Sequence, residues 1–317
     1  MSEGAKVATL TLNPAVDRTV QVANFAAGEV NRVSEDQSDA GGKGINVASF
    51  LSHVGHKVAV SGLLGKDNLG IFEELFVRKG IDDHFIRMDG ATRVNVKIVD
   101  PALEQVTDLN FPGLGNCGEA EGVISETIIK LVSSGIETIV LAGSLPAGLP
   151  TTYYRDLTIL LKELGCKVIL DASGPSFAEA MKAGPNIIKP NIDELSELVG
   201  RPLVTPEDVV TAAREVNEGE IELIVVSMGA DGAIFIKSDE VLLAKPPKAI
   251  VKSTVGAGDA MVAGIVHGLS EEKSLSDVAC LATGFSLGAL GEIGPHLPPR
   301  EAIEAFAAQV TLQHLKF

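Results

Sequence analysis

The sequence predicts an α/β fold built on an open, doubly wound and mostly parallel sheet that helices flank on both faces. Short runs rich in Val, Ile and Leu alternate along the chain with segments of helical periodicity. Most of these runs are apolar throughout, as expected of parallel strands that are buried on both faces. Hydrophobic residues make up 45% of the 317 residues, which is enough to bury a sizeable core.

The elements follow in a regular order. The expected core strands are residues 7–12, 58–63, 138–141, 168–170, 186–188 and 223–227, and the expected helices are residues 44–53, 69–78, 119–132, 152–164, 206–217 and 260–269. Residues 17–38 and 92–111 break this rhythm because they alternate apolar and polar residues without a helical period. They predict either a small inserted β-sheet lid with antiparallel segments, within about residues 14–40 and 88–112, or two surface hairpins. We expect residues 1–317 to form a single domain that carries these insertions.

Charge and cysteine content exclude several classes of protein. The net charge of −16 at pH 7 argues against nucleic acid and anionic membranes as partners. Cys117, Cys166 and Cys280 are odd in number and form no C-x-x-C pair, so neither a disulfide framework nor a zinc site is expected. The N-terminus lacks the apolar core of a signal peptide, and no apolar run reaches the ~18–20 residues of a membrane span. We therefore expect a cytoplasmic protein.

The segment S-T-V-G-A-G-D at residues 253–259 carries the strongest chemical signal, because it runs directly into an apolar helix. The small residues Gly256, Ala257 and Gly258 let the backbone approach a ligand, and the first N–H groups of the helix favour negative charge. Such an anion hole suits the charge that develops during phosphoryl transfer, and Asp259 lies where it can deprotonate an attacking hydroxyl. The helix dipole is expected to lower the pKa of Asp259. The simpler alternative is a glycine turn whose Asp259 only complements that dipole.

A second glycine-rich segment, A-G-G-K-G-I-N-V-A at residues 40–48, opens the first predicted helix. Gly41 and Gly42 would admit a sugar against the backbone, and Lys43 would hold a phosphate as a point charge. The spacing is not that of a Walker loop. A tight turn with a helix cap also explains the glycines, but it leaves a cation at the positive end of a helix, which is unfavourable without an anionic ligand.

Side chains after the first strand and on the second insertion provide polar groups for a sugar. Asp17 follows an N-P turn at the expected carboxyl end of the sheet, where its carboxylate can accept hydrogen bonds from hydroxyl groups; a plain turn is the alternative. Arg93, Asn95 and Lys97 recur with a period of two and therefore share one face of a strand. That face contacts phosphate and hydroxyls if it points into the cleft, and otherwise it is exposed to solvent.

Two further loops follow predicted strands. In K-P-N-I-D-E at residues 189–194, Asn191 and Glu194 match N-x-x-E, which is also the pattern of a helix capping box, and the residues alone favour capping. The segment S-M-G-A-D-G at residues 227–232 predicts either a hairpin turn or a loop against a nucleotide.

Together, residues 40–48, 253–259 and the N-x-x-E element resemble the signatures of the ribokinase-like, phosphofructokinase B family of sugar kinases, in the same order and over nearly the whole chain. Residues 9–17, 65–68, 92–98, 142–146 and 253–259 resemble the branch of that family that acts on D-fructose 1-phosphate. The resemblance implies a ribokinase-like fold and transfer of the γ-phosphoryl group of ATP, with Mg²⁺, to give D-fructose 1,6-bisphosphate. The alternatives are a kinase for tagatose 6-phosphate or fructose 6-phosphate and a non-catalytic sugar-phosphate sensor. No G-x-G-x-x-G follows the first strand, which argues against a nicotinamide-dependent oxidoreductase.

The resemblance also implies roles for individual residues. It makes Asp259 the catalytic base and places Gly256, Ala257 and Gly258 in the anion hole. It places a sugar phosphate against Asp17, Gly42, Lys43, Asn46, Arg93 and Asn95. It places ATP against Lys189, Ser227, Gly229, Gly232, Gly256 and Gly258, and Mg²⁺ water ligands near Asn191 and Glu194. Many members carry Asp-Thr and a monovalent cation site where this chain has Ser253 and Thr254, so potassium dependence is doubtful. A homodimer formed through the lid is compatible with this pattern.

Overall fold

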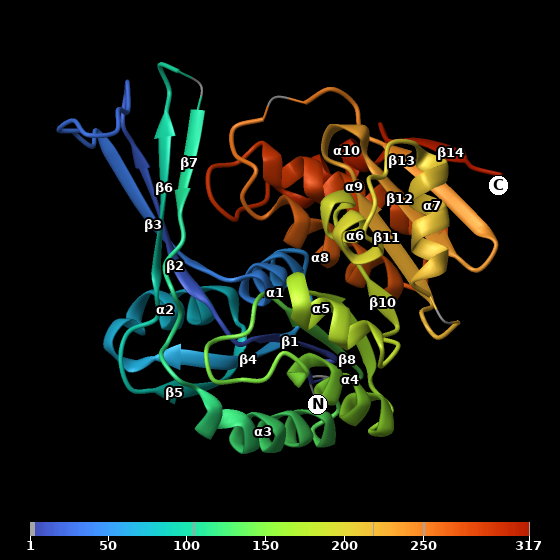
Figure 1. Cartoon of the computed structure of the whole chain (residues 1–317), viewed down its shortest axis with the longest axis horizontal. Coiled ribbons are helices and arrows are strands. Elements are labelled where there is room, and N and C mark those ends of the chain that lie inside the picture. The colour runs from blue at the N-terminus through green and yellow to red at the C-terminus, as the bar shows by residue number, and fades with distance from the viewer. Residues whose placement is uncertain (1–3, 104, 218, 250, 317) are drawn as a thin grey trace.

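The computed structural model describes residues 4–103, 105–217, 219–249 and 251–316, and it contains a ten-stranded sheet and a separate four-stranded sheet. The strand order of the large sheet is β14-β13-β12-β11-β10-β9-β8-β1-β4-β5 (Figure 1). Neighbouring strands from β5 to β11 are parallel, and β12, β13 and β14 extend one edge in antiparallel order. The predicted, mostly parallel α/β fold is therefore confirmed.

The bounds of the elements are as follows. The strands of the large sheet are β1 (Val7–Thr11), β4 (Val58–Gly65), β5 (Asp82–Met88), β8 (Thr138–Ala142), β9 (Lys167–Asp171), β10 (Ile187–Ile188), β11 (Leu223–Ser227), β12 (Ala233–Lys237), β13 (Glu240–Lys245) and β14 (Thr311–His314). The α-helices are α1 (Lys43–His53), α2 (Gly70–Lys79), α3 (Glu121–Ser133), α4 (Tyr153–Glu163), α5 (Gly174–Met181), α6 (Ile192–Val199), α7 (Pro206–Glu215), α8 (Ala257–Ser270), α9 (Leu275–Leu290) and α10 (Arg300–Ala307). Short 3-10 helices cover Lys66–Asn68, Gly118–Ala120 and Gly229–Asp231.

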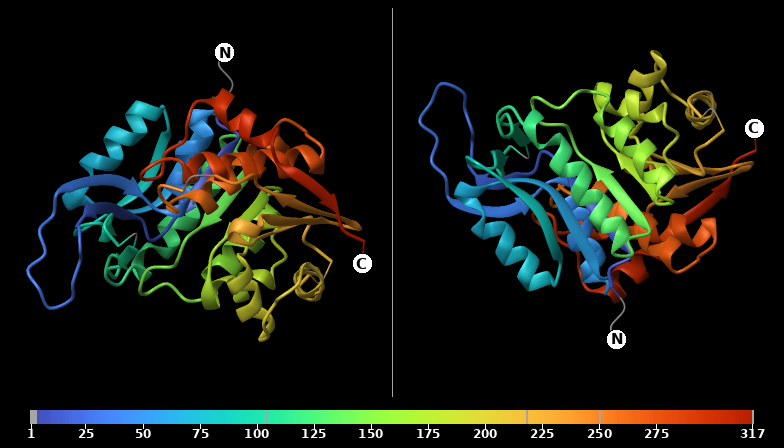
Figure 2. Two further views of the ribbon diagram at one scale, coloured as in Figure 1. Left: turned by 90° about the horizontal axis from the view of Figure 1, so that it is seen from above. Right: turned by 90° about the horizontal axis from the view of Figure 1, so that it is seen from below.

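Two apolar layers cover the two faces of the large sheet. One layer packs α1, α2, α8 and α9 against the sheet and includes Phe50, Phe72 and Phe285. The other packs α3, α4, α5, α6 and α7 against the opposite face and includes Tyr154 and Phe177. Figure 2 shows these two groups of helices on either side of the sheet. All eight residues of β4 are buried, which explains why the predicted strands are apolar throughout rather than alternating.

The second sheet, called here the lid sheet, contains β2 (Ala15–Gln21), β3 (Glu35–Gly41), β6 (Val94–Asp100) and β7 (Gln105–Leu109) in the order β3-β2-β6-β7. It stands away from the core in Figure 1 and has a small apolar cluster of its own, made by Val20, Val22 and Ile98. Each predicted insertion forms an antiparallel pair, but β2 and β6 pair in parallel. The expected antiparallel pairing is therefore correct within each insertion. It is wrong between the two insertions, where β2 and β6 run in the same direction.

Helices α8 and α9 pack closely because small residues meet at their contact. A Cβ atom on Gly264 would lie 2.6 Å from the Cα atom of Ala282, and this backbone atom cannot rotate away. We predict that Gly264→Ala lowers the free energy of unfolding by about 1–3 kcal/mol, as overpacking does, although alanine is the better helix former. Urea unfolding followed by circular dichroism measures the change.

Gly122→Ala on α3 is the matched control, because no atom lies within 4 Å of the position that its Cβ would take. This substitution should raise the free energy of unfolding by about 0.4–1 kcal/mol. Equal effects of the two substitutions would contradict the packing argument.

Candidate active site

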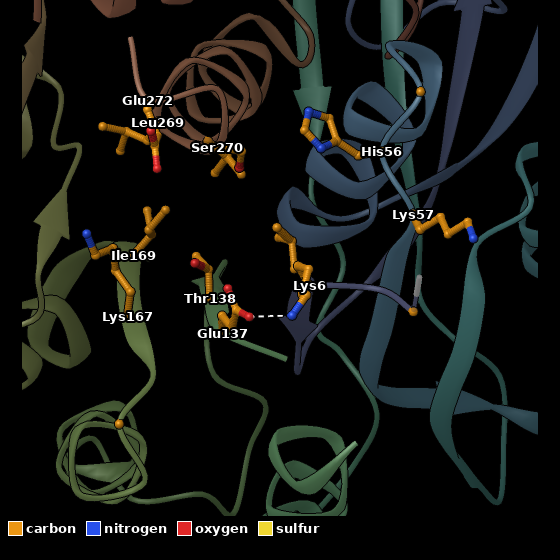
Figure 3. Close-up of a pocket in the computed structure, with 15 residues that line it drawn as sticks. Lys6, His56, Lys57, Glu137, Thr138, Lys167, Ile169, Leu269, Ser270 and Glu272 are labelled. Atoms are coloured by element: carbon orange, nitrogen blue, oxygen red, sulfur yellow. Dashed lines mark hydrogen bonds and ion pairs between the residues drawn. The ribbon is translucent and has the colours of Figure 1, made fainter. Parts of the chain in front are cut away.

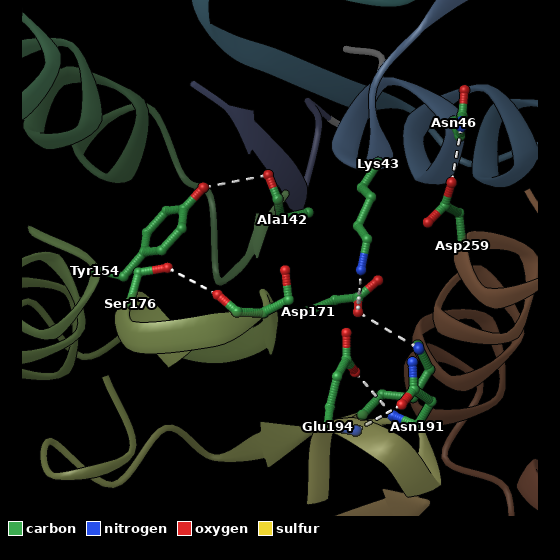
Figure 4. A network of polar contacts seen from close by, with 11 residues as sticks. Lys43, Asn46, Ala142, Tyr154, Asp171, Ser176, Asn191, Glu194 and Asp259 are labelled. Atoms are coloured by element: carbon green, nitrogen blue, oxygen red, sulfur yellow. Dashed lines mark hydrogen bonds and ion pairs between the residues drawn. The ribbon is translucent and has the colours of Figure 1, made fainter. Parts of the chain in front are cut away.

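The predicted chemical segments meet at the carboxyl edge of the parallel strands. β8 lies between β1 and β9 in the sheet, and the turns that follow these strands open at this edge. Figure 4 shows Lys43 and Asn46 of α1, Asp171 of β9 and Asp259 of α8 converging there, with Glu194 nearby. Open α/β sheets bind ligands at this edge.

Helix α8 begins with the geometry of an anion hole. Gly256 precedes it with a φ of 76°, a left-handed conformation that favours glycine. A Cβ atom at this position would lie 3.3 Å from the ring of Phe50 and 3.4 Å from the Cα atom of Pro295. The first N–H groups of a helix have no acceptor within it and are directed out of its N-terminus. The predicted glycine turn into a helix is confirmed, and anion binding there stays a prediction.

Asp259 lies in the first turn of α8, where it is 7% exposed. Its Oδ2 accepts a hydrogen bond of 2.7 Å from Nδ2 of Asn46. Burial, reinforced by the carboxylate of Asp171, raises the pKa of Asp259 to about 6. Lys43 and Lys189 partly offset this rise. The expectation that the helix dipole leaves Asp259 with a lowered pKa is wrong, because the loss of hydration outweighs the dipole.

The centre of the site is a buried carboxylate that the sequence analysis does not single out, Asp171 at the end of β9. Oδ1 of Asp171 lies 3.0 Å from Nζ of Lys43 (Figure 4). It also lies 3.4 Å from Nζ of Lys189. Oδ2 has no hydrogen-bond partner among the described residues. Burial alone would raise the pKa of Asp171, but Lys189 and Lys43 hold it below its ordinary value. Its place directly after the apolar run 168–170 is the sequence signal that could have identified it.

Asp171 also changes the argument about Lys43. Lys43 begins α1, where a cation is unfavourable, and from the sequence alone an anionic ligand is expected to compensate. That requirement does not hold, because the protein supplies the anion itself. Burial opposes the charge of Lys43, yet Asp171 and Asp259 raise its pKa above the ordinary value. The side chain is 35% exposed, so its contact with a sugar phosphate stays a prediction.

Close contacts within the protein require glycine at the two positions before α1, Gly41 and Gly42. A Cβ atom on Gly41 would lie 2.1 Å from Oδ2 of Asp17, and one on Gly42 would lie 2.9 Å from Cγ2 of Thr11. Gly42 also has a φ of 123°. Protein atoms therefore fill the space that side chains would take, whether or not a sugar binds, and contact between Gly42 and a sugar stays a prediction.

A cavity of about 230 Å³ lies between the lid sheet and the start of α8. Its lining includes Asp17, Asn95 and Lys97 from the lid sheet and Val255 from the turn before α8. Nδ2 of Asn95 donates a hydrogen bond of 3.1 Å to Oδ1 of Asp17, and burial raises the pKa of Asp17. Asn95 and Lys97 therefore face the cleft, as one of the two predicted arrangements requires.

Arg93 makes a different set of contacts. Its guanidinium donates hydrogen bonds to the carbonyl oxygens of Asn13 at 3.0 Å, Pro14 at 3.2 Å and Phe111 at 3.0 Å. It thereby ties the turn after β1 to the segment after β7. The phosphate contact of Arg93 stays a prediction, and support of these loops is the alternative.

Asn191 and Glu194 form the predicted capping box at the start of α6. Oδ1 of Asn191 accepts a hydrogen bond of 2.7 Å from the N–H of Glu194, and Oε2 of Glu194 accepts one of 2.8 Å from the N–H of Asn191. The capping interpretation is confirmed. In the part of the chain that the structure describes, no group of three or more His, Cys, Asp or Glu side chains could hold a metal ion. An action of Asn191 and Glu194 on Mg²⁺ through water stays a prediction.

Residues 227–232 form the turn of the β11–β12 hairpin, so the hairpin interpretation is confirmed. The N–H of Met228 donates a hydrogen bond of 2.8 Å to the carbonyl of Gly232. Gly229 and Gly232 have φ values of 58° and 95°, which favour glycine. A β-bridge joins Ser227 to Asn191 and brings this turn beside the capping box. Contact of Ser227, Gly229 and Gly232 with a nucleotide stays a prediction.

A separate hollow of about 820 Å³ opens at the opposite, amino-terminal edge of the sheet, where β1, β8 and β9 begin (Figure 3). Lys6 and Glu137 form an ion pair in its lining. The lining residues among those described include none of the predicted site residues. The hollow therefore lies apart from the candidate active site.

Comparison with known proteins agrees with the resemblance. A profile of the pfkB family carbohydrate kinases matches residues 10–300. The 1-phosphofructokinase of Rhodobacter capsulatus is 50% identical over 311 residues, which cover 98% of this chain and 98% of that protein. The 1-phosphofructokinase of Xanthomonas campestris pv. campestris is 43% identical over 286 residues, which cover 88% of this chain and 89% of that protein.

A solved structure of a further relative has the same fold. The phosphofructokinase-2 of Escherichia coli in complex with substrates and products superposes with a TM-score of 0.89 at 28% identity, covering 96% of this chain and 99% of that chain. The same protein has also been solved in complex with potassium and in a tetrameric inhibited form, with TM-scores of 0.87 and 0.86. Both of these structures are 27% identical and cover 96% of this chain and 98% of that chain.

The raised pKa of Asp259 makes its ionisation visible in the pH dependence of activity. We predict that kcat/KM is level above pH 7 and falls below about pH 6, because protonated Asp259 cannot accept a proton. Asp259→Asn should lower kcat by ~10²–10⁴, the usual contribution of a positioned base, and leave ligand affinity largely intact. Steady-state kinetics from pH 5 to 8, with isothermal titration of ATP, measure both.

Asp156→Asn is the control for this substitution, because Asp156 is an exposed carboxylate on α4. It should keep the activity and the pH profile of the unmodified protein. Near-normal turnover of Asp259→Asn would show that Asp259 only complements the helix dipole.

Proposed function

The chain belongs to the pfkB family of carbohydrate kinases, and we propose that it transfers the γ-phosphoryl group of ATP to the free primary hydroxyl of D-fructose 1-phosphate. Membership of this family makes it a phosphotransferase with ATP as co-substrate. The two relatives at 50% and 43% identity, both 1-phosphofructokinases, support the choice of sugar phosphate. The structural observation that carries the proposal is a buried base, Asp259, at the start of α8, with two lysines converging on Asp171 beside it.

The arrangement of these residues suits direct transfer of the γ-phosphoryl group from ATP to the sugar hydroxyl. Asp259 takes the proton of the sugar hydroxyl while the hydroxyl oxygen bonds to the γ-phosphorus and the bond to ADP breaks. A pKa of about 6 leaves Asp259 mostly ionised at neutral pH, and Asn46 orients its carboxylate. The N–H groups of Gly256, Ala257 and Gly258 stabilise the negative charge that develops on the transferred group.

We assign the sugar phosphate to the cavity beneath the lid sheet. Asp17 and Asn95 lie in its lining, where their oxygen and nitrogen atoms can bond to the sugar hydroxyls. Gly42, Lys43, Asn46 and Arg93 complete the proposed set of contacts. In this proposal residues 1–317 act as one kinase domain, and the lid sheet excludes water from the reacting groups.

The nucleotide and Mg²⁺ occupy the neighbouring part of the site. We assign ATP to Lys189, to the turn with Ser227, Gly229 and Gly232, and to the start of α8. The residues near this turn fit Mg²⁺ held through water, because Glu194 uses Oε2 in the cap and leaves Oε1 without a partner among the described residues. When bound, Mg²⁺ neutralises phosphate charge.

The proposal assigns no role to potassium, because Ser253 stands where many family members carry Asp. It includes a homodimer formed through the lid sheet and the adjoining loop, which expose the apolar side chains of Val30, Val106, Leu109 and Phe111. Across the described ranges, the helices are too short or too polar to cross a membrane. We propose a cytoplasmic location.

A coupled assay that detects ADP tests the function directly. Fructose 1-phosphate, fructose 6-phosphate, tagatose 6-phosphate and fructose are compared at matched concentrations. We expect kcat/KM to be highest for fructose 1-phosphate by about tenfold or more, a ratio that one well-placed phosphate contact can provide. A preference for another sugar phosphate would reassign the substrate, and binding without turnover would indicate a sensor.

Glu194→Gln distinguishes between two roles of Glu194: capping of α6, and an action on Mg²⁺ through water. Glutamine keeps the capping hydrogen bond, so the melting temperature should change little. Loss of the charge should raise the Mg²⁺ concentration needed for half-maximal activity by about 5- to 50-fold, as expected when a charge-assisted contact is lost. Titration of activity with MgCl₂ measures the shift.

Asp208→Asn is the matched control, because Thr205 and Asp208 form the same kind of capping box at the start of α7. It should affect thermal stability to a similar extent and leave the Mg²⁺ dependence unchanged. An unaltered Mg²⁺ requirement in Glu194→Gln would remove Glu194 from the site.

Arg93→Ala distinguishes between two roles of Arg93: direct contact with the phosphate of the sugar, and support of the neighbouring loops. If Arg93 contacts the sugar phosphate, KM for fructose 1-phosphate should rise roughly 10- to 150-fold, with little change in KM for ATP. The already low activity with unphosphorylated fructose should then fall little further in the variant. A comparable loss with both sugars would show that Arg93 acts through the carbonyls of Asn13, Pro14 and Phe111. Arg201→Ala, an exposed arginine paired with Glu215, is the control.

A further inference from the structure

We infer that His296, between α9 and α10, is a positioning residue for the sugar phosphate, because it holds the carboxylate of Asp39 on lid strand β3 against the wall of the anion hole. The inference rests on the proposed function, since it takes the cavity beneath the lid sheet as the sugar-phosphate site. We call residues 291–299 the bridging segment.

The bridging segment forms one wall of the candidate active site. Gly294 and Pro295 line the same cavity as Asp17. Pro295 also lies against the glycine turn before α8, since a Cβ atom on Gly256 would be 3.4 Å from its Cα atom. The backbone that shapes the anion hole is therefore in contact with the bridging segment.

The same segment contacts the lid sheet at Asp39. Nε2 of His296 lies 3.4 Å from Oδ1 of Asp39, and Nε2 of Gln37 donates a hydrogen bond of 2.8 Å to Oδ2. Gly294 has a φ of 78°, and its Cβ atom would lie 2.8 Å from Oδ2 of Asp39. The Asp39 side chain is 17% exposed and the His296 side chain is 44% exposed, so this contact is partly shielded from solvent. The lid sheet, the bridging segment and the anion hole thus form one connected wall.

The charge of Asp39 explains why this contact matters. Asp39 pairs directly with Asp17 across β2 and β3, so the two carboxylates lie on the same face of the lid sheet, and both line the cavity. Like charges at opposed positions are unfavourable, and Asp39 adds to the effect of burial in raising the pKa of Asp17. A sugar phosphate brings further negative charge into the same space. Holding Asp39 toward His296 leaves Asp17 free to accept hydrogen bonds from the sugar.

A double-mutant cycle tests this role on the full chain. His296→Ala should raise KM for fructose 1-phosphate about 3- to 10-fold, the size expected for a partly exposed charged contact, with kcat and KM for ATP within about twofold. Asp39→Ala removes the like charge beside Asp17 and should lower KM for fructose 1-phosphate about twofold. Because His296 acts through Asp39, adding His296→Ala to Asp39→Ala should change KM by no more than about twofold. His296→Gln keeps a donor toward Asp39 and should restore KM to within about twofold of the unmodified protein.

A second pair of variants tests the contact without removing either partner. Gly294→Ala places a methyl group against Oδ2 of Asp39 and should raise KM for fructose 1-phosphate at least as much as His296→Ala. Gly165→Ala, after α4 and away from the site, is the matched control, because Gly165 has a φ of 79° and no atom lies within 4 Å of the position that its Cβ would take. His314→Ala, at an exposed histidine on β14, controls for the loss of a histidine. Both control variants should keep the KM of the unmodified protein.

The outcomes separate this inference from the proposed function. Independent effects in the double variant, with KM changing by the product of the single effects, would overturn the role of His296 while the function stands. A fall in melting temperature and kcat at constant KM would show a merely structural contact and would also overturn it. Failure of the unmodified protein to phosphorylate fructose 1-phosphate would overturn the proposed function, and this inference with it.

Discussion

The buried carboxylate of Asp171 is the interaction on which the geometry of the candidate site depends. An ionised carboxylate in the interior is strongly destabilising unless it is paired, and Lys43 and Lys189 lie 3.0 and 3.4 Å from its Oδ1. Lys43 begins α1, and Lys189 directly follows β10, so one charge ties two elements to the end of β9. The same charge acts on Asp259, whose pKa it helps to raise. Asp171 therefore connects the two cations of the site with its proposed base.

The local structure of the site explains how a protein with a large negative net charge can bind anionic ligands. The chain carries a net charge of −16, which would repel ATP and a sugar phosphate at long range. The N-terminus of α8 presents N–H donors at one point of the sheet edge, and Lys43 and Lys189 offset the charges of Asp171 and Asp259 there. The bridging segment adds a histidine beside Asp39, where the lid sheet brings two carboxylates face to face. We infer that ligand binding depends on the short-range placement of these N–H groups and cations rather than on the net charge of the protein.

Much of the fold could be predicted, because the signals involved are local. The six predicted core strands are all present, with the run at 186–188 reduced to the two residues of β10. The edge strands β5 and β14 are absent from the prediction because their runs, D-D-H-F-I-R-M and T-L-Q-H, are largely polar and half exposed or exposed. The parallel pairing of β2 with β6 could not be predicted, since alternation shows that a strand has two different faces but not how its neighbour runs.

The sequence by itself determined the features that depend on neighbouring residues: the glycine turn before α8, the capping box of Asn191 and Glu194, and the hairpin turn at 227–232. Only the tertiary structure decided the partner of Lys43, the raised pKa of Asp259 and the use of Arg93 on backbone carbonyls. Lys43 and Asp171 are 128 residues apart in the chain, and Asn46 and Asp259 are 213 apart. Hydration and Coulomb interactions depend on which groups the fold brings within a few ångströms of one another, and neither spacing nor periodicity in the sequence specifies this.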